Sequence, residues 1–324
     1  MLQEDLASLS DIWNLPYAQG QWSMPLPWGW DWDTRKHLHE AYGVKMTQLP
    51  TDAELELLRD LSSRQTTVTL CQELTKRVDN SVFHRPVFLQ TQEELFDFIR
   101  QCDECHERFV LKSPWSSSGR GLICSHTRGR DGALSPVSRE QLIQQGMSVL
   151  RKMGGVMGEK WVERKEHDFA MLFFASPTQV KFVGYSLFDN DEGGNSTTYR
   201  QGFLLSNERI EQLLTHGDSA LIAQLRAIAR AYEDILTQLL HPLAGRPWQV
   251  GYMGIDMLTY RADNEVAEDQ EAPPRIHACV ELNLRCTMGV VCRLWYEQNR
   301  QEGLFHISPM QQNRHFYYEF LPTL

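Results

Sequence analysis

The sequence contains no long apolar run and no export signal. In a chain of 324 residues, no hydrophobic stretch approaches the ~20 residues that a membrane-spanning helix needs. The first residues, Met1-Leu-Gln-Glu-Asp, lack the basic start and the apolar centre of a signal peptide. We therefore expect a cytoplasmic protein without a membrane partner.

An excess of basic residues and a second cysteine pair are also missing. The formal net charge is -10, which argues against a general nucleic-acid binder. Seven scattered cysteines, an odd number, are typical of reduced thiols. The motif Cys102-Asp-Glu-Cys105-His106 has the spacing of a haem attachment site. However, it ends an amphipathic helical pattern and no other CxxC exists, so we expect Cys102 to be buried and Cys105 to be exposed.

Polar and apolar side chains alternate in residues 280–289, near the C-terminal end. In an extended strand, Glu281, Asn283 and Arg285 share one face, while the apolar residues between them pack into a core. Residues 251–260 predict a second strand, and pairing of the two as a hairpin places Asp256 opposite Glu281. These oxygen ligands suit a hard cation such as Mg²⁺. The alternative is a cross-strand ion pair on a solvated face.

A second polar segment follows the buried strand predicted at residues 108–112. Lys112 ends that strand, and the small residues of the loop 113–121 precede another apolar strand at 122–124. Small residues let backbone N–H groups converge on a phosphate, and Lys112 adds a positive charge. The loop is not a Walker motif, because GxxxxGK[ST] does not occur and a strand follows it. A flexible hairpin remains the alternative.

The remaining pattern predicts helices alternating with strands. A tryptophan- and proline-rich segment at 25–33 is interpreted as packing rather than as a ligand platform. It precedes a short helix at about 34–42, capped by Asp33 or Thr34. The polar segment 189–202 predicts either a mobile lid carrying Arg200 or a hairpin loop. Further helices are expected at about 52–62, 65–76, 92–107, 138–153, 219–240 and 290–299, and further strands at about 84–89, 155–162, 168–174 and 180–188.

In this order the motifs resemble those of the ATP-grasp superfamily, from about Arg64 to Met288. The segment from Phe109 to Gly121 looks like its strand lysine and small-residue phosphate loop, and Glu159-Lys-Trp-Val162 like its adenine-reading hinge. The resemblance implies metal ligands at Asp256, Glu281 and Asn283, and phosphate contacts from Arg285, Lys112 and Arg64. It implies nucleotide contacts from Ser116, Ser117, Ser118, Gly119, Glu159, Lys160, Trp161 and the ribose-binding Asp168. Arg200 is expected at the γ-phosphate or the incoming carboxylate.

The resemblance implies an α+β fold in which two subdomains clamp a nucleotide between antiparallel sheets. We expect a reduced N-terminal region (1–85), a small subdomain (86–165) and a large subdomain with the metal site (166–324). The implied activity is an ATP- and Mg²⁺-dependent (or Mn²⁺-dependent) ligase that joins a small-molecule or peptide carboxylate to an amine through an acyl phosphate. A small-molecule kinase and a non-catalytic ATP-binding regulatory protein remain alternatives. Neither the acceptor nor the oligomeric state follows from the sequence.

Overall fold

A computed structural model describes most of the chain. The described residues are 26–78, 85–116, 121–128, 133–193, 196–246, 248–249, 251–261, 274–309 and 316–322. Ser117, Ser118 and Gly119 of the expected phosphate loop lie outside these ranges, as do residues 1–25 and 79–84 of the expected N-terminal region. The expected α+β architecture, with two separate antiparallel sheets, is confirmed by the strand order.

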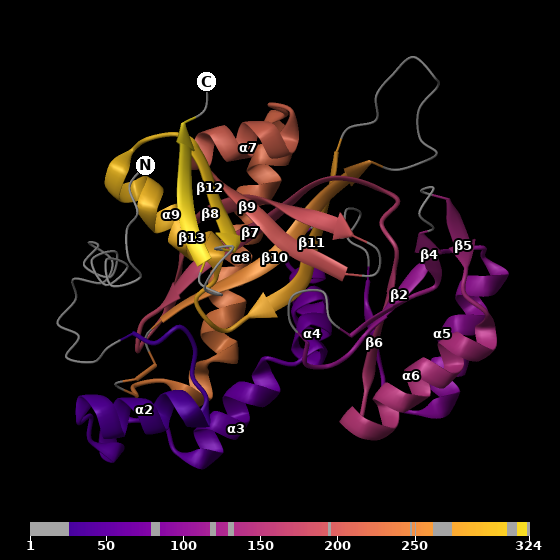
Figure 1. Ribbon diagram of the computed structural model, residues 1–324, viewed down its shortest axis with the longest axis horizontal. Coiled ribbons are helices and arrows are strands. Elements are labelled where there is room, and N and C mark those ends of the chain that lie inside the picture. Colours follow the sequence, from indigo (N-terminus) through magenta and orange to yellow (C-terminus); the bar gives the residue numbers. More distant parts are fainter. Residues whose placement is uncertain are drawn as a thin grey trace.

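The first sheet has four antiparallel strands and carries helices on one face (Figure 1). Leu111 and Val156 point from this sheet into a core shared with the helices. Alternation along the strands then places Lys112 and Glu159 on the opposite face. The strands, in spatial order, are β1 (Val87–Leu89), β6 (Val156–Lys160), β2 (Phe109–Lys112) and β3 (Leu122–Cys124), and the helices are α5 (Gln92–Glu104) and α6 (Arg139–Met153). A separate two-stranded ribbon contains β4 (His126–Arg128) and β5 (Leu134–Pro136).

The second sheet has seven antiparallel strands and is covered on both faces. In spatial order these are β11 (Arg275–Asn283), β10 (Gly251–Arg261), β7 (Arg164–Ala175), β8 (Val180–Gly193), β9 (Ser196–Leu204), β12 (Gly303–Pro309) and β13 (Phe316–Pro322). The largest core lies on the face covered by α4 (Arg64–Thr75), α7 (Asn207–Thr215) and α8 (Ser219–Leu239). On the other face, α9 (Met288–Asn299) packs on Ala170, Leu172 and Tyr252.

Local sequence signals explain where several helices begin and end. Capping boxes start α3 (Asp52–Leu61) and α5, where Thr51 and Thr91 exchange hydrogen bonds with a glutamate three residues on. Helix α2 (Trp32–Tyr42) is capped by Asp31, so the expectation of Asp33 or Thr34 was wrong. Short 3-10 turns occur at η2 (Met46–Gln48) and η4 (His241–Leu243).

Several segments differ from the sequence-based expectation. Of the two alternatives for segment 189–202, the structure shows the hairpin, but the paired strands β8 and β9 cover most of the segment that was expected to be a loop. Helix α7 and the C-terminal pair β12–β13 were not expected at all. Helix α5 ends at Glu104 rather than at residue 107, because His106 adopts a left-handed conformation with a φ of 53°. Cys102 is buried and Cys105 is exposed, as expected.

The tryptophan-rich segment lies against the end of β11. Trp30 packs edge-on against Trp248, with ring centroids 5.9 Å apart, so the packing interpretation is confirmed for this residue. It is wrong for Trp28, which is 43% exposed. The carbonyl of Trp28 accepts a hydrogen bond of 2.7 Å from the Cys286 backbone N–H, which fixes the segment beside Arg285.

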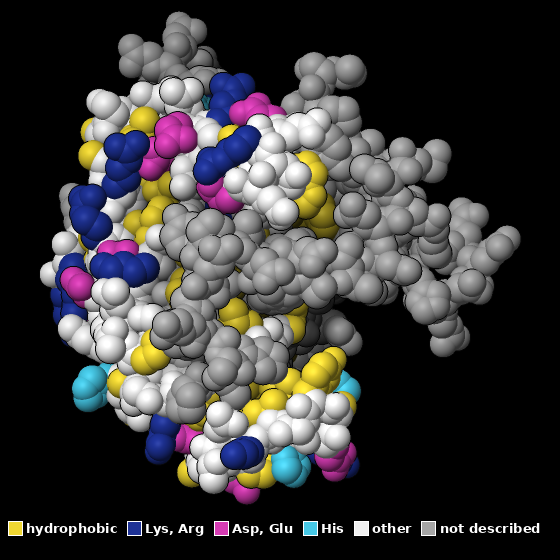
Figure 2. Space-filling model, turned by 90° about the vertical axis from the view of Figure 1, so that its left-hand side faces the viewer, with side chains coloured by type: hydrophobic (Ala, Val, Ile, Leu, Met, Phe, Trp, Pro, Cys, Tyr) yellow, Lys and Arg dark blue, Asp and Glu magenta, His cyan; other side chains and the backbone are white. Residues whose placement is uncertain are grey.

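The described surface carries charges of both signs. Figure 2 shows Lys and Arg side chains interspersed with Asp and Glu on one face, rather than a continuous basic area. Among the described helices, none combines the length and the hydrophobicity needed to cross a membrane.

Candidate functional site

The predicted row of polar residues forms at the paired ends of β10 and β11. Asp256 lies directly opposite Glu281, as the hairpin expectation required. The Asn283 Nδ2 donates a hydrogen bond of 3.0 Å to Asp256 Oδ2. The structure therefore brings together the three oxygen-bearing side chains that were expected to bind a metal.

A bulge in β11 separates this row from the first part of the same strand. Asp256 and Leu258 of β10 are two residues apart, whereas their partners in β11, Glu281 and His277, are four residues apart. The bulge turns Cys279 into the main core, where it is fully buried. His277 nevertheless emerges on the same side of the sheet as Glu281.

The two carboxylates of the row repel each other. Burial, reinforced by the negative charge of Glu281, raises the pKa of Asp256 to about 7, although the hydrogen bond from Asn283 opposes the rise. Such a pair is stabilised by a cation placed between its oxygens, and carboxylate and amide oxygens are the ligands that Mg²⁺ prefers. The donor set fits a hard divalent ion. Among the described residues, no group of three His, Cys, Asp or Glu side chains is arranged to bind a metal, so Asn283 would have to serve as a ligand.

Arg64, the first residue of α4, joins the acidic row to the phosphate loop. Its Nη2 lies 3.2 Å from Glu281 Oε2 and 3.1 Å from Ser116 Oγ. Its Nε donates a hydrogen bond of 3.1 Å to the Ser113 carbonyl, and its own backbone N–H donates to the Pro114 carbonyl at 2.9 Å. Only 7% of the Arg64 side chain is exposed. One buried guanidinium therefore contacts both halves of the predicted site.

Lys112 and Glu159 meet on the helix-free face of the first sheet. They form a buried ion pair, and the second carboxylate oxygen of Glu159 contacts Nε2 of His277. Although burial acts to raise the pKa of Glu159, the charges of Lys112 and His277 hold it well below its usual range. The two sheets are thus connected by charged side chains. Sequence reasoning missed His277, whose one local signal is a polar residue within an apolar strand.

Lys160 and Trp161, which were expected in the adenine-reading hinge beside Glu159, lie at the surface. Lys160 forms an exposed ion pair of 2.6 Å with Glu107, and the Arg108 guanidinium lies 5.3 Å from the ring centre of Trp161.

Asp168, which was expected to bind the ribose, lies on β7. It accepts hydrogen bonds from Lys165 Nζ at 2.8 Å and from Asn190 Nδ2 at 3.0 Å.

The two remaining arginines occupy different environments. Arg285 is partly buried, and its Nη1 donates a hydrogen bond of 3.2 Å to the Cys286 carbonyl. Gly29 approaches it so closely that a Cβ at this position would lie 3.0 Å from the Arg285 Cβ. Arg200 is exposed on β9, which is separated from β10 by β7 and β8. The structure therefore does not bring Arg200 to the acidic row.

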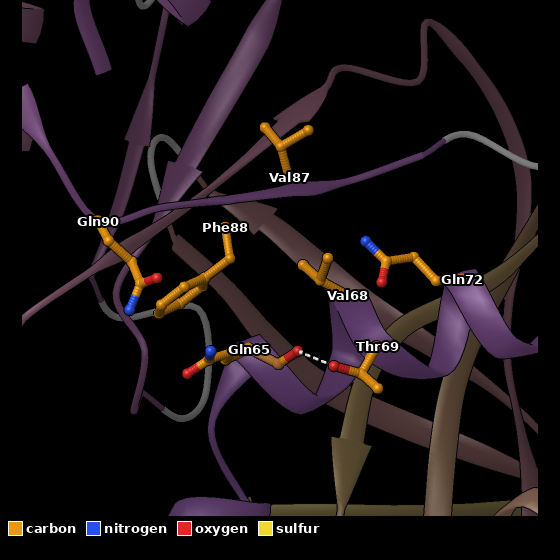
Figure 3. A pocket seen from close by; sticks show the side chains of 7 residues that line it. All are labelled: Gln65, Val68, Thr69, Gln72, Val87, Phe88 and Gln90. Atoms are coloured by element: carbon orange, nitrogen blue, oxygen red, sulfur yellow. Dashed lines mark hydrogen bonds between the residues drawn. The ribbon is translucent and has the colours of Figure 1, made fainter. Parts of the chain in front are cut away.

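A surface pocket lies elsewhere, between α4 and β1 (Figure 3). In Figure 3, Phe88 and Val68 form its apolar part, and glutamine side chains surround them. Thr69 Oγ1 donates a hydrogen bond of 3.2 Å to the Gln65 carbonyl. The pocket is lined by Gln65, Val68, Thr69, Gln72, Val87, Phe88 and Gln90. None of the predicted site residues lines it.

Comparison with known proteins gives matches to solved structures alone. No protein-family model and no curated protein matches the sequence. An N5-carboxyaminoimidazole ribonucleotide synthetase in an ADP complex is 16% identical, and the match covers 79% of this chain and 52% of that chain, with a TM-score of 0.42. The enzyme of the same name from Thermus thermophilus is 12% identical over 90% and 74% of the two chains, with a TM-score of 0.48. Biotin carboxylase from Campylobacter jejuni is 12% identical over 82% and 49%, with a TM-score of 0.47.

These matches describe a distant likeness in chain arrangement. The chain spans about half the length of the first of them. Similarity of this degree assigns neither a reaction nor a substrate.

Proposed function

We propose that this protein is an ATP- and Mg²⁺-dependent ligase that joins a carboxylate to an amine. One observation carries the proposal: the buried guanidinium of Arg64 contacts Ser116 of the small-residue loop and Glu281 of the acidic row at the same time. This contact supports a cation site and a phosphate site that would adjoin each other, as binding of a magnesium–nucleotide complex requires. We further propose that residues 86–165 and 166–324 act as the two halves of the clamp.

The residues would divide the work between the metal and the phosphates. Asp256, Glu281 and Asn283 would hold Mg²⁺, which would offset the negative charge of the phosphates. Lys112 and Arg285 would contact the phosphates, and Arg64 would hold the loop at Ser113 and Ser116 against the acidic row.

In the proposed reaction, a carboxylate oxygen of the substrate attacks the γ-phosphorus of ATP, and the bond to the β-phosphate oxygen breaks to release ADP. The acyl phosphate formed is then attacked at its carbonyl carbon by an amine, which loses a proton as inorganic phosphate leaves. No side-chain nucleophile is required, because positioning and charge stabilisation supply the catalysis.

Calorimetric titration with a non-hydrolysable ATP analogue tests the nucleotide site. We expect the wild-type protein to bind the analogue more tightly with Mg²⁺ than without it. Asp256→Asn should lose this dependence on Mg²⁺ while it retains weak binding of the metal-free analogue. Absence of binding under every condition would contradict the proposal and would leave Glu281 with only its ion pair to Arg64.

Hydroxylamine separates a ligase from the alternative small-molecule kinase. During turnover with a pool of candidate carboxylates, an acyl phosphate is trapped as a hydroxamate, whereas a kinase accumulates a stable phosphorylated product. ADP release together with hydroxamate supports the ligase. ADP release together with a stable phosphate ester would replace it with the kinase.

A further inference from the structure

A buried cluster of three charged or titratable side chains joins the two sheets. Lys112 comes from β2, Glu159 from β6 and His277 from β11. Each side chain is at most 9% exposed. Lys112 contacts one oxygen of the Glu159 carboxylate, and Nε2 of His277 contacts the other.

The chemistry of the cluster determines the direction of its hydrogen bonds. Both oxygens of an ionised carboxylate are acceptors, so the imidazole must present N–H at Nε2 and donate it to Glu159. If a buried carboxylate loses a hydrogen-bond donor, we expect it to turn to another donor, because an unsatisfied buried charge has a high free-energy cost. The closest cation to replace His277 as a donor is Lys112, which already contacts Glu159.

An ammonium group has three donors and no acceptor. While His277 holds one carboxylate oxygen, Glu159 engages Lys112 through the other, and N–H groups of Lys112 stay free to turn toward phosphate. If both oxygens turned to Lys112, the carboxylate would compete with a phosphate for the same ammonium group.

We propose that His277 is a positioning residue for nucleotide binding, which holds Glu159 so that Lys112 remains available to the phosphates. The inference rests on the proposed ATP site, in which Lys112 contacts the nucleotide. His277 itself does not contact the nucleotide and acts through Glu159.

The test compares variants that differ in the donor at position 277. His277→Leu removes the donor and keeps an apolar filling, whereas His277→Gln keeps an N–H donor of similar reach. A matched control is Tyr232→Phe, because the Tyr232 hydroxyl donates a buried hydrogen bond of 3.0 Å to the Ala278 carbonyl of the same strand. Tyr232 faces the helical core rather than the cluster.

Each variant is titrated with a non-hydrolysable ATP analogue and, by competition, with adenosine. We expect His277→Leu to weaken binding of the analogue about 10-fold, as loss of a charge-assisted contact predicts, with little change for adenosine. His277→Gln should restore binding to within about 3-fold of wild type. Tyr232→Phe should lower the melting temperature and leave both affinities unchanged.

Two outcomes would overturn the role of His277 without affecting the proposed ATP site. One is a folded His277→Leu protein that binds the analogue as the wild type does. The other is an equal loss for the analogue and adenosine, which would indicate general disruption of the site. If the leucine variant does not fold, His277→Asn replaces it, since its amide is too short to reach Glu159. Wild-type protein that binds no analogue would overturn the proposed function and, with it, this inference.

Discussion

The repulsion between Asp256 and Glu281 predicts that a single neutral substitution stabilises the metal-free protein. In Asp256→Asn, the amide keeps an oxygen that accepts the Asn283 hydrogen bond, while the negative charge disappears. The pKa of Asp256 is raised to about 7 in the folded protein, whereas a carboxyl group in an unfolded chain titrates near 3.9, roughly.

The sign of the effect follows from proton binding. Between about pH 4 and pH 7 the folded protein holds the Asp256 proton more tightly than the unfolded chain does, so the stabilisation from protonation is lost as the pH rises through this range. The difference between the pKa values of Asp256 in the folded and the unfolded chain corresponds to at most about 4 kcal/mol of stability. Because Asp256 is only partly buried, solvent screening reduces this value, and we expect about 1–3 kcal/mol.

The assay is urea unfolding in the presence of EDTA at pH 5 and pH 8. The free energy of unfolding of Asp256→Asn should exceed that of the wild type, and this excess should be about 1–3 kcal/mol larger at pH 8 than at pH 5. An equal difference at both pH values would refute the reasoning. Added Mg²⁺ should reduce the difference at pH 8, because it stabilises the wild type in place of the missing proton.

Three further predictions concern the phosphate site, the metal site and the packing of the first sheet. Lys112→Ala should weaken binding of the ATP analogue by about 10- to 100-fold, measured by calorimetry; an unchanged affinity would remove Lys112 from the phosphate site. Glu281→Gln should abolish Mg²⁺-dependent ADP release without changing the circular dichroism spectrum, and retained activity would contradict its role as a ligand. Gly158→Ala should lower the free energy of unfolding by about 1–3 kcal/mol, because its Cβ would lie 2.8 Å from the Phe98 ring. Gly251→Ala, where a Cβ meets nothing within 4 Å, is the control in urea unfolding, and an equal loss in both variants would contradict the packing argument.

Much of the local structure was predictable because its signals are local. Thr91 and Glu94 mark the start of α5 through a capping box, and the alternation around Glu281 identified both its strand and its partner Asp256. For segment 189–202 the sequence left a mobile lid and a hairpin loop open, because its polar, glycine-containing composition is typical of both. Within the segment β8 and β9 pair with each other, and the remainder of these two strands pairs with β7 and β12. A single sequence does not display such cross-strand partners.

The candidate site was predicted in its components and not in its connections. Residue type and spacing identified Lys112 and the acidic row, whereas Glu159 was expected at a hinge only from the family resemblance, and His277 was not identified. Arg64 was expected to contact phosphate, and its contact with Glu281 was not foreseen. Arg200 was expected at the γ-phosphate or the incoming carboxylate, whereas β9 places it away from the acidic row.

The sequence by itself determined the oxygen-rich strand pair and the small-residue loop, because alternation and composition act over a few residues. Only the tertiary structure decided that Arg64 lies between these two elements, and that Glu159 is shared by Lys112 and His277. Arg64 and Glu281 are 217 residues apart in the chain, and Glu159 and His277 are 118 apart. Contacts at such separation arise from the packing of whole sheets and helices, which brings charged groups into a shared, poorly solvated space where they must satisfy one another.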